Sequence, residues 1–192
     1  MMRKILLAAA AAMALSACGQ LLGGGNGPAL PTVQEGAQAP STQVRPTGQV
    51  QRAQIDDATR TQLIANIGEQ LGAISQNFAA GMAPPAGATD QIVALEPSTD
   101  HRWTIDLAAN TAYTFVGACD GDCTNVDIEL ISMSTGGVVA SDMLPDDYPV
   151  VQFTPPADGQ YMVRTLLQNC SVAPCYVGSR ALAMPAGGEA PK

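Results

Sequence analysis

The chain has 192 residues, a formal net charge of −8, 14% charged residues, 19 Gly and 14 Pro. This length suits one compact domain with flanking segments, and the Gly and Pro content favours turn-rich β-structure over a helical bundle. An acidic surface repels phosphates, so the composition argues against nucleic-acid binding.

The first 17 residues have the pattern of a bacterial export signal. Arg3 and Lys4 form a positive start, and residues 5–15 are an apolar run that is too short for a permanent bilayer-spanning helix. The run ends in Leu15-Ser16-Ala17-Cys18, which resembles the lipobox of bacterial lipoproteins. The resemblance implies that residues 1–17 are a cleaved signal peptide and that the Cys18 thiol is lipidated. A secretory leader with a coincidental Cys is the alternative.

The lipobox resemblance also predicts a location. Such precursors typically receive a further acyl chain on the mature N-terminus, and two or more chains hold a protein stably on a membrane. The second mature residue is Gly19, whereas Asp at that position is associated in this family with inner-membrane retention. We therefore expect an envelope protein that is lipid-anchored in the outer rather than the inner membrane, on its periplasmic or surface face. Loss of Arg3 and Lys4 with the leader changes the net charge from −8 to −10.

A tether and a helix are expected next. Residues 18–48 are rich in Gly, Pro, Gln and Ala without hydrophobic periodicity, which predicts a flexible, disordered tether. Residues 50–82 are expected to hold one amphipathic helix, with Asp56 or Asp57 as its N-cap and Gly81 beyond its end. Its apolar face repeats at steps of three and four: Leu63, Ile64, Ile67, Leu71, Ile74 and Phe78. We expect this face to pack on the following domain, and docking onto a partner is the alternative.

After Pro85 the hydrophobic period changes to two. Trp103, Ile105 and Leu107 share one strand face, and Val126, Ile128 and Leu130 alternate with acids. The expected strands lie at residues 101–107, 111–118, 125–132, 138–140, 149–154, 160–168 and 176–183. Residues 90–184 therefore predict a mainly β fold, an antiparallel sandwich or jelly roll of about seven or eight strands. Residues 185–192 are expected to be a disordered tail.

The folded part contains four cysteines: Cys119, Cys123, Cys170 and Cys175. An even number in an exported domain predicts disulfides, for which three connectivities exist. We expect two local bridges, Cys119–Cys123 and Cys170–Cys175, whose main role is to fix loop geometry. A zinc site built from the four thiolates is the alternative, although the spacing differs from known zinc motifs.

Carboxylates gather around the first Cys pair and farther along the chain. Between Arg102 and Arg164 there are nine acids and no Lys or Arg. Oxygen-rich clusters with Gly at a bend suit Ca²⁺, although the spacing is not that of an EF-hand. The candidate calcium ligands are Asp120, Asp122, Asp127, Glu129, Asp146 and Asp147. Solvated strand faces and Asp-rich turns are the alternative interpretation.

Several segments together resemble the bacterial pre-peptidase C-terminal (PPC) domain. They are Trp103-Thr-Ile-Asp-Leu, Tyr113-Thr-Phe-Val-Gly-Ala-Cys-Asp-Gly-Asp-Cys, Val126-Asp-Ile-Glu-Leu, Asp146-Asp-Tyr-Pro-Val-Val-Gln-Phe-Thr-Pro and Gly159-Gln-Tyr-Met-Val-Arg. The resemblance covers about residues 90–183 and implies a small β-sandwich of exported proteins, some of which bind Ca²⁺ or an extracellular polymer. Asn125 and Glu129 stand where the family often has Asp. No peptidase domain precedes the module here, so we expect a PPC-like domain on a lipid tether.

The residues offer little for catalysis. His101, the one histidine, begins a predicted strand and is expected at the surface or a strand edge. Nucleophile-elbow, HExxH and P-loop motifs do not occur in the sequence. We therefore expect a non-catalytic, membrane-anchored lipoprotein that displays a β-sandwich for binding a protein or glycan. The second hypothesis is an accessory protein for a separately encoded exported peptidase, acting through the helix. A glycan-acting hydrolase is the third.

Overall fold

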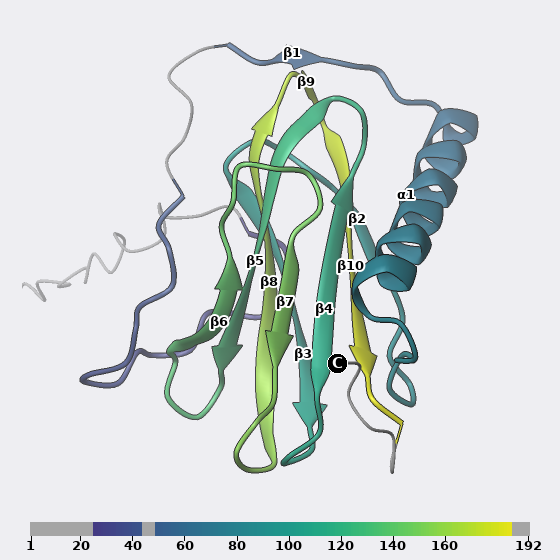
Figure 1. The fold of residues 1–192 in the computed structure, drawn as a ribbon. Coiled ribbons are helices and arrows are strands. Elements are labelled where there is room, and N and C mark those ends of the chain that lie inside the picture. The colour runs from purple at the N-terminus through teal and green to yellow at the C-terminus, as the bar shows by residue number, and fades with distance from the viewer. Residues whose placement is uncertain (1–24, 44–48, 186–192) are drawn as a thin grey trace, which may run out of the picture.

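The structure, a computed structural model, describes residues 25–43 and 49–185. Its elements are β1 (Gln51–Arg52), α1 (Asp57–Phe78), β2 (Gln91–Leu95), β3 (Thr99–Leu107), β4 (Tyr113–Cys119), β5 (Cys123–Ser132), β6 (Val138–Asp142), β7 (Val150–Phe153), β8 (Gly159–Cys170), β9 (Val172–Ala173) and β10 (Cys175–Ala183). Two four-stranded antiparallel sheets, β2-β10-β4-β7 and β3-β8-β5-β6, form a sandwich, and β1 pairs with β9 in parallel (Figure 1). The predicted mainly β sandwich with one preceding helix is confirmed.

Helix α1 begins where the sequence provides a cap. The Thr59 N–H donates to Asp56 Oδ1 at 2.7 Å, so Asp56 is the N-cap, and this hydrogen bond lowers the pKa of the carboxyl. The helix ends at Phe78, where the Ala79 N–H donates to the Ser75 carbonyl at 2.9 Å. The predicted N-cap is therefore confirmed, whereas α1 is shorter than the predicted span of residues 50–82.

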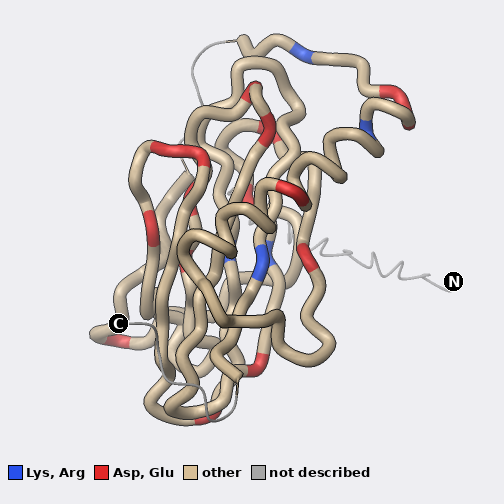
Figure 2. Tube along the Cα trace, turned by 45° about the vertical axis from the view of Figure 1, so that its right-hand side comes forward, with Lys and Arg blue, Asp and Glu red and all other residues tan. Residues whose placement is uncertain are grey.

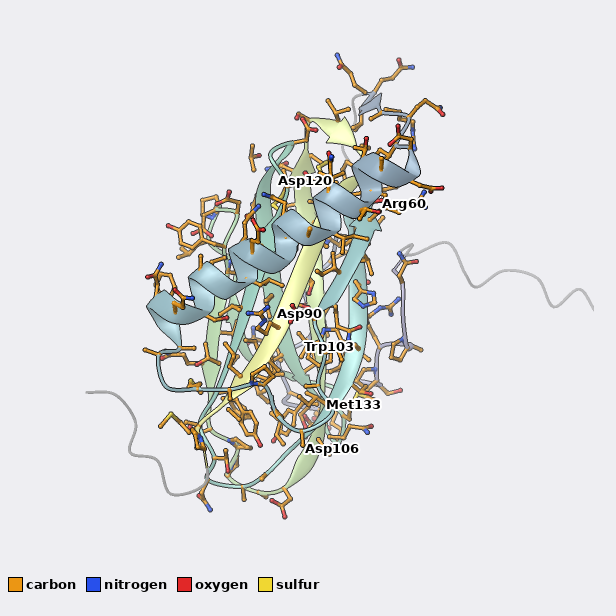
Figure 3. All side chains as sticks on the ribbon, turned by 90° about the vertical axis from the view of Figure 1, so that its right-hand side faces the viewer. Arg60, Asp90, Trp103, Asp106, Asp120 and Met133 are labelled. Atoms are coloured by element: carbon orange, nitrogen blue, oxygen red, sulfur yellow. A yellow bond between two sulfur atoms is a disulfide. The ribbon has the colours of Figure 1, made fainter. Side chains whose placement is uncertain are left out.

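The apolar face of α1 packs on the outer side of the β2-β10-β4-β7 sheet, and Figure 3 shows the helix lying diagonally across the strands. Ile67 and Leu71 are fully buried there. Gly178 of β10 permits the close approach, because a Cβ atom at this position would overlap Ile67 Cγ2. Docking of the helix onto the domain is thus confirmed, although Ile64 and Phe78 remain exposed.

The main core lies between the two sheets. Trp103, Ile105 and Leu107 of β3 share the inward face, as the alternation predicts, and pack with residues such as Phe115 and Leu130. Each four-stranded sheet thereby buries one face against the other. On β4 the opposite face is also buried, because α1 covers it.

The outward face of the β3-β8-β5-β6 sheet is also buried. Asp100, Glu129 and Arg164 lie on this face, and each is at most 5% exposed. Ile131 and Met162, which are cross-strand partners on the same face, are fully buried. The expectation of solvated acids on these strands is therefore wrong for β5. The alternation of apolar and acidic residues did identify the two faces, but a further layer of chain covers the outer one.

That layer is the segment of residues 25–43, which we call the strap. Its backbone is hydrogen-bonded to the sheet at Asn26, Gln38 and Ser41 and to the β5–β6 turn at Gln34. The expectation of a disordered tether over residues 18–48 is therefore wrong for residues 25–43. An extended segment needs no hydrophobic period to donate and accept backbone hydrogen bonds at a sheet, so its composition did not predict this packing. The remaining parts of that range, residues 18–24 and 44–48, lie outside the described residues.

Two other outcomes concern the ends of the domain. β2 was not predicted, because Gln91–Leu95 does not alternate between apolar and polar residues. In the structure it pairs antiparallel with β10. The signal peptide, Cys18, Gly19 and residues 186–192 of the predicted tail lie outside the described residues. Within the part of the chain that the structure describes, no helix has the length and apolar character needed to cross a membrane.

Candidate functional site

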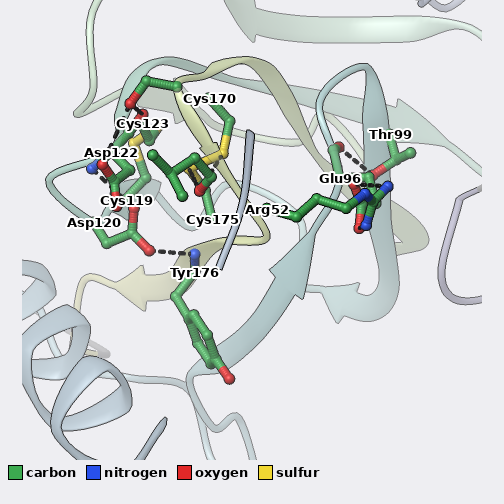
Figure 4. Close-up of a disulfide and its surroundings, with 12 residues drawn as sticks. Arg52, Glu96, Thr99, Cys119, Asp120, Asp122, Cys123, Cys170, Cys175 and Tyr176 are labelled. Carbon is green, nitrogen blue, oxygen red and sulfur yellow. Dashed lines mark hydrogen bonds and ion pairs between the residues drawn. A yellow bond between two sulfur atoms is a disulfide. The ribbon is translucent and has the colours of Figure 1, made fainter. Parts of the chain in front are cut away.

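Both disulfides lie at one end of the sandwich. The bridges are Cys119–Cys123 and Cys170–Cys175, with Cα atoms 5.9 Å and 6.1 Å apart, so the predicted pairing is present (Figure 4). Cys123 and Cys170 are register partners on β5 and β8, which places the two small loops side by side. Each bridge closes a loop at the end of a strand and so fixes the shape of this end.

Asp120 and Asp122, two of the predicted calcium ligands, connect these loops. Asp120 Oδ2 accepts a hydrogen bond from the Tyr176 N–H at 2.6 Å, which joins the first disulfide loop to β10 (Figure 4). Burial raises the pKa of the Asp120 carboxyl. The Asp122 carbonyl accepts from the N–H of Ser171 at 2.8 Å and so joins the two disulfide loops. These acids therefore have structural partners in the protein itself.

Asp127 and Glu129 are neighbours on the outward face of β5, but they have different partners. Glu129 Oε2 pairs with Arg164 Nη1 at 2.8 Å, and Glu129 Oε1 accepts from the Ser41 N–H at 2.8 Å. Asp127 Oδ2 accepts from Gln168 Nε2 at 2.5 Å, and its other oxygen is buried and makes no hydrogen bond to the residues that the structure describes. Burial raises the pKa of Asp127 to about 6, and nearby carboxylates add to the rise.

The β6–β7 loop, residues 143–149, holds the last two predicted ligands. Asp146 Oδ1 accepts from the Tyr148 N–H at 3.2 Å, and the Asp146 carbonyl accepts from the Val126 N–H at 3.0 Å. At the base of the loop, Asp142 Oδ2 accepts from the N–H of Val150 at 2.9 Å. Asp147 is exposed. The loop is therefore an Asp-rich turn, which was the alternative interpretation of these residues.

The six candidate calcium ligands thus lie in three parts of the fold: the disulfide end, the outward face of β5 and the β6–β7 loop, of which the last two approach each other at Asp127 and Asp146. Among the residues that the structure describes, no group of three or more His, Cys, Asp or Glu side chains is arranged to hold a metal ion. A calcium site requires several oxygens converging at 2.3–2.6 Å around one point. The donor sets found here therefore give the calcium hypothesis no support.

An exposed surface joins the β6–β7 loop to the end of α1. Phe78 and Tyr148 stack with ring centroids 6.4 Å apart, and both are 47% exposed. Leu144 is 62% exposed and Met143 is 42% exposed in the same loop. We call these four side chains, together with the carboxylate of Asp147, the acidic–apolar surface. Acidic positions are spread over several loops of the described trace, whereas basic positions are few (Figure 2).

The acidic–apolar surface is the strongest candidate for recognition. Large exposed apolar side chains that adjoin one another commonly mark binding sites, while single ones do not. Sequence reasoning missed it because Phe78 belonged to the helix face expected to be buried, and the loop offered only its acids. The signal that could have found it is the run Met143-Leu144, which carries no strand or helix period.

A second feature lies between the strap and the β3-β8-β5-β6 sheet. Its volume is about 410 Å³, and Leu30, Pro31 and Pro40 of the strap form apolar walls. Asp100 pairs with Arg102 at 3.0 Å and with Arg164 at 2.6 Å beneath it. The positive and negative side chains of these ion pairs neutralise each other, so the cavity offers no unpaired charge to a ligand.

His101 lies on the edge strand β3, as expected. It is partly buried, and burial lowers its pKa. Its ring nitrogens make no hydrogen bond of good geometry with the described residues. A base that is bonded to no nucleophile provides no catalytic pair.

Comparisons with known proteins do not assign this chain to a family. No family model matches the chain, and no curated protein is significantly similar to it. Among solved structures, the chain is similar to Aeromonas hydrophila PliG, described as a periplasmic lysozyme inhibitor of g-type lysozyme. The identity is 12% and the TM-score 0.35, over 49% of this chain and 85% of that one. A TM-score of this size carries no conclusion about function, and the resemblance to the PPC family stays a prediction.

Proposed function

We propose that this protein is a non-catalytic, lipid-anchored binding protein of the bacterial envelope, which holds a basic exported protein on its acidic–apolar surface. The observation that carries the proposal is that surface: four large apolar side chains, exposed from 42% to 62%, beside a loop rich in Asp. Aromatic and Met side chains are enriched in protein interfaces. Disulfides persist in oxidising compartments, which supports an envelope location.

Charge determines the kind of partner that we propose. The chain from Trp103 to Val163 contains nine acids and no Lys or Arg, so a partner at the β6–β7 loop meets only carboxylates from this stretch. Complementary charge speeds encounter and disfavours acidic partners. A basic surface with an apolar centre therefore fits best, and nucleic acid and anionic lipid headgroups fit poorly.

The structure changes how a helix-mediated accessory role would operate. The central apolar residues of α1, Ile67 and Leu71, are fully buried against the domain, so a partner has no access to them. The end of α1 at Phe78, by contrast, is exposed and stacks on Tyr148 of the β6–β7 loop. If the partner is an exported peptidase, it would contact this end and the β6–β7 loop.

Site-specific photocrosslinking in intact cells tests the proposal. A photoreactive residue replaces Leu144, and the control carries it at Gln62, which is exposed near the other end of α1. We expect an adduct from position 144 and none from position 62. The partner found by mass spectrometry should be basic, and its purified form should bind the purified protein less tightly as salt increases.

Two charge-reversal variants provide the matched comparison. Asp147→Lys should weaken binding of the purified partner about tenfold, since it removes one attraction and adds one repulsion. Glu69→Lys makes the same change in charge at an exposed position of α1 and should leave binding nearly unchanged. Equal adducts from both crosslinking positions, or equal binding of the two variants, would refute the proposed surface.

A further inference from the structure

The start of the strap is held firmly to the edge of the sandwich. The Asn26 N–H donates to the Asp100 carbonyl at 2.8 Å, and the Asn26 carbonyl accepts from the Arg102 N–H at 2.7 Å. Gly27 has φ of +117°, and a Cβ atom there would overlap the Arg102 carbonyl oxygen. The close backbone approach therefore requires Gly at this position.

The end of the strap is held by buried charges. The Ser41 N–H donates to Glu129 Oε1, and the Ser41 carbonyl accepts from Arg164 Nη1, both at 2.8 Å. The side chains of Glu129 and Arg164 are each 4% exposed. Lifting the strap would expose this ion pair and remove two of its hydrogen bonds, so the docked strap belongs to the folded domain.

We infer that the docked strap shortens the membrane tether, so that the strap side of the sandwich lies against the lipid surface and α1 faces away from it. The inference rests on the proposed lipidation of Cys18. The chain advances only seven residues from Cys18 to Gly25, which spans at most about 25 Å. A free tether over residues 18–48 would have spanned at most about 110 Å.

The order of the layers determines which side of the domain the short tether holds toward the membrane. Figure 1 shows the purple N-terminal segment on one side of the sandwich and α1 on the other. The second sheet lies about 10 Å beyond the first, and the helix adds a layer of about 10 Å. The end of α1, where Phe78 belongs to the acidic–apolar surface, is therefore presented on the side opposite the membrane, where an exported partner can reach it.

The lone tryptophan provides a natural probe of this geometry. Trp103 lies on β3 beside the strap anchor, and its Nε1 donates to Ser179 Oγ at 3.1 Å, which holds the indole in place. Full-length lipidated protein is reconstituted into phosphatidylcholine vesicles that contain a dansyl-labelled headgroup lipid. Energy transfer from Trp103 to dansyl reports the height of β3 above the bilayer.

Four proteins are compared. The wild type should show strong transfer. A variant with twenty Gly and Ser residues inserted before Gly25 should show less than half of it, because the insert adds about 25 Å of average reach. Gly27→Ala should also lose transfer by releasing the strap anchor. The control Gly36→Ala should not, because Gly36 also has a positive φ, of +82°, but its Cβ would meet nothing within 4 Å.

The outcomes separate the inference from the proposed function. Acylated Cys18 with equal transfer in the wild type and the insertion variant would overturn the inference alone. The mass of the N-terminal peptide shows whether Cys18 carries acyl chains. Unmodified Cys18, with protein that does not bind vesicles, would overturn the proposed anchoring and with it the inference. Equal transfer in Gly27→Ala and Gly36→Ala variants that both fold would show that the strap does not set the height.

Discussion

Asp127 gives the domain a defined dependence of stability on pH. The side chain is 2% exposed, accepts one hydrogen bond from Gln168 and lies near the carboxylates of Asp142, Glu129 and Asp146. Burial and these charges raise its pKa to about 6, above its ordinary value of 3.8. The folded state therefore binds this proton more tightly than the unfolded state, so the contribution of Asp127 favours folding at low pH and is lost as pH rises through about 6.

The size of the effect follows from the two pKa values. The full difference corresponds to about 3 kcal/mol between strongly acidic and neutral solution. Between pH 7.5 and pH 4.5 the contribution of Asp127 should change by about 2 kcal/mol. Asp127→Asn is isosteric and neutral at every pH, and its amide oxygen can still accept from Gln168. The substitution should therefore stabilise the protein at pH 7.5 by up to about 3 kcal/mol and by much less at pH 4.5.

Urea unfolding monitored by Trp103 fluorescence measures this directly. Wild type, Asp127→Asn and Asp147→Asn are unfolded at intervals from pH 4.5 to 7.5, with the disulfides intact. For each variant, its free energy of unfolding at each pH is subtracted from that of the wild type. The difference cancels the titration of all groups that the two proteins share. Asp147 is the matched control, since it is exposed and makes no hydrogen bond or ion pair within the described residues. If the wild type and Asp127→Asn differ by the same amount at every pH, the reasoning is refuted.

Four further predictions concern buried charge, the disulfide end and the packing and propensity of α1. Arg164→Met should cost about 3–5 kcal/mol in urea unfolding because it leaves a buried carboxylate unpaired, and it should expose the strap to limited proteolysis. Replacing Cys170 and Cys175 by Ser should lower the free energy of unfolding by about 2 kcal/mol, the loop-closure entropy of a five-residue separation. Gly178→Ala should cost about 1–3 kcal/mol by pushing α1 away from β10. By contrast, Gly68→Ala, which meets no atom within 4 Å, should raise the thermal midpoint, since Ala favours the helix by about 1 kcal/mol.

The features that could be predicted from the sequence are local ones. The cap at Asp56 depends on one side chain and an N–H three residues later. The alternation of Trp103, Ile105 and Leu107 shows which residues of β3 face the core, because a strand has a period of two. The Cys119–Cys123 bridge joins residues four apart, so chain connectivity brings them together.

The features that were missed depend on contacts between distant segments. The strap pairs Asn26 with β3 through its backbone N–H and carbonyl. Every residue type except Pro has both groups, so nothing in the composition marks the contact. The stacking of Phe78 on Tyr148 likewise joins residues seventy positions apart. Because the strap also covers the outward face of the sheet, the error about the tether produced the error about the acids of β5.

The contrast between Asp127 and Glu129 shows why spacing alone could not assign these acids a role. Both lie on the outward face of β5, two residues apart, and both carry a negative charge in water. Register places Glu129 opposite Arg164 but Asp127 opposite Leu166, so one buried acid has a cation beside it and the other has an apolar side chain. The first forms an ion pair that holds the strap, and the second keeps a raised pKa. The presence of a cation across the strand pair therefore separates the two acids: Glu129 pairs with Arg164 and holds the strap, whereas Asp127 is buried among carboxylates without such a partner and has a raised pKa.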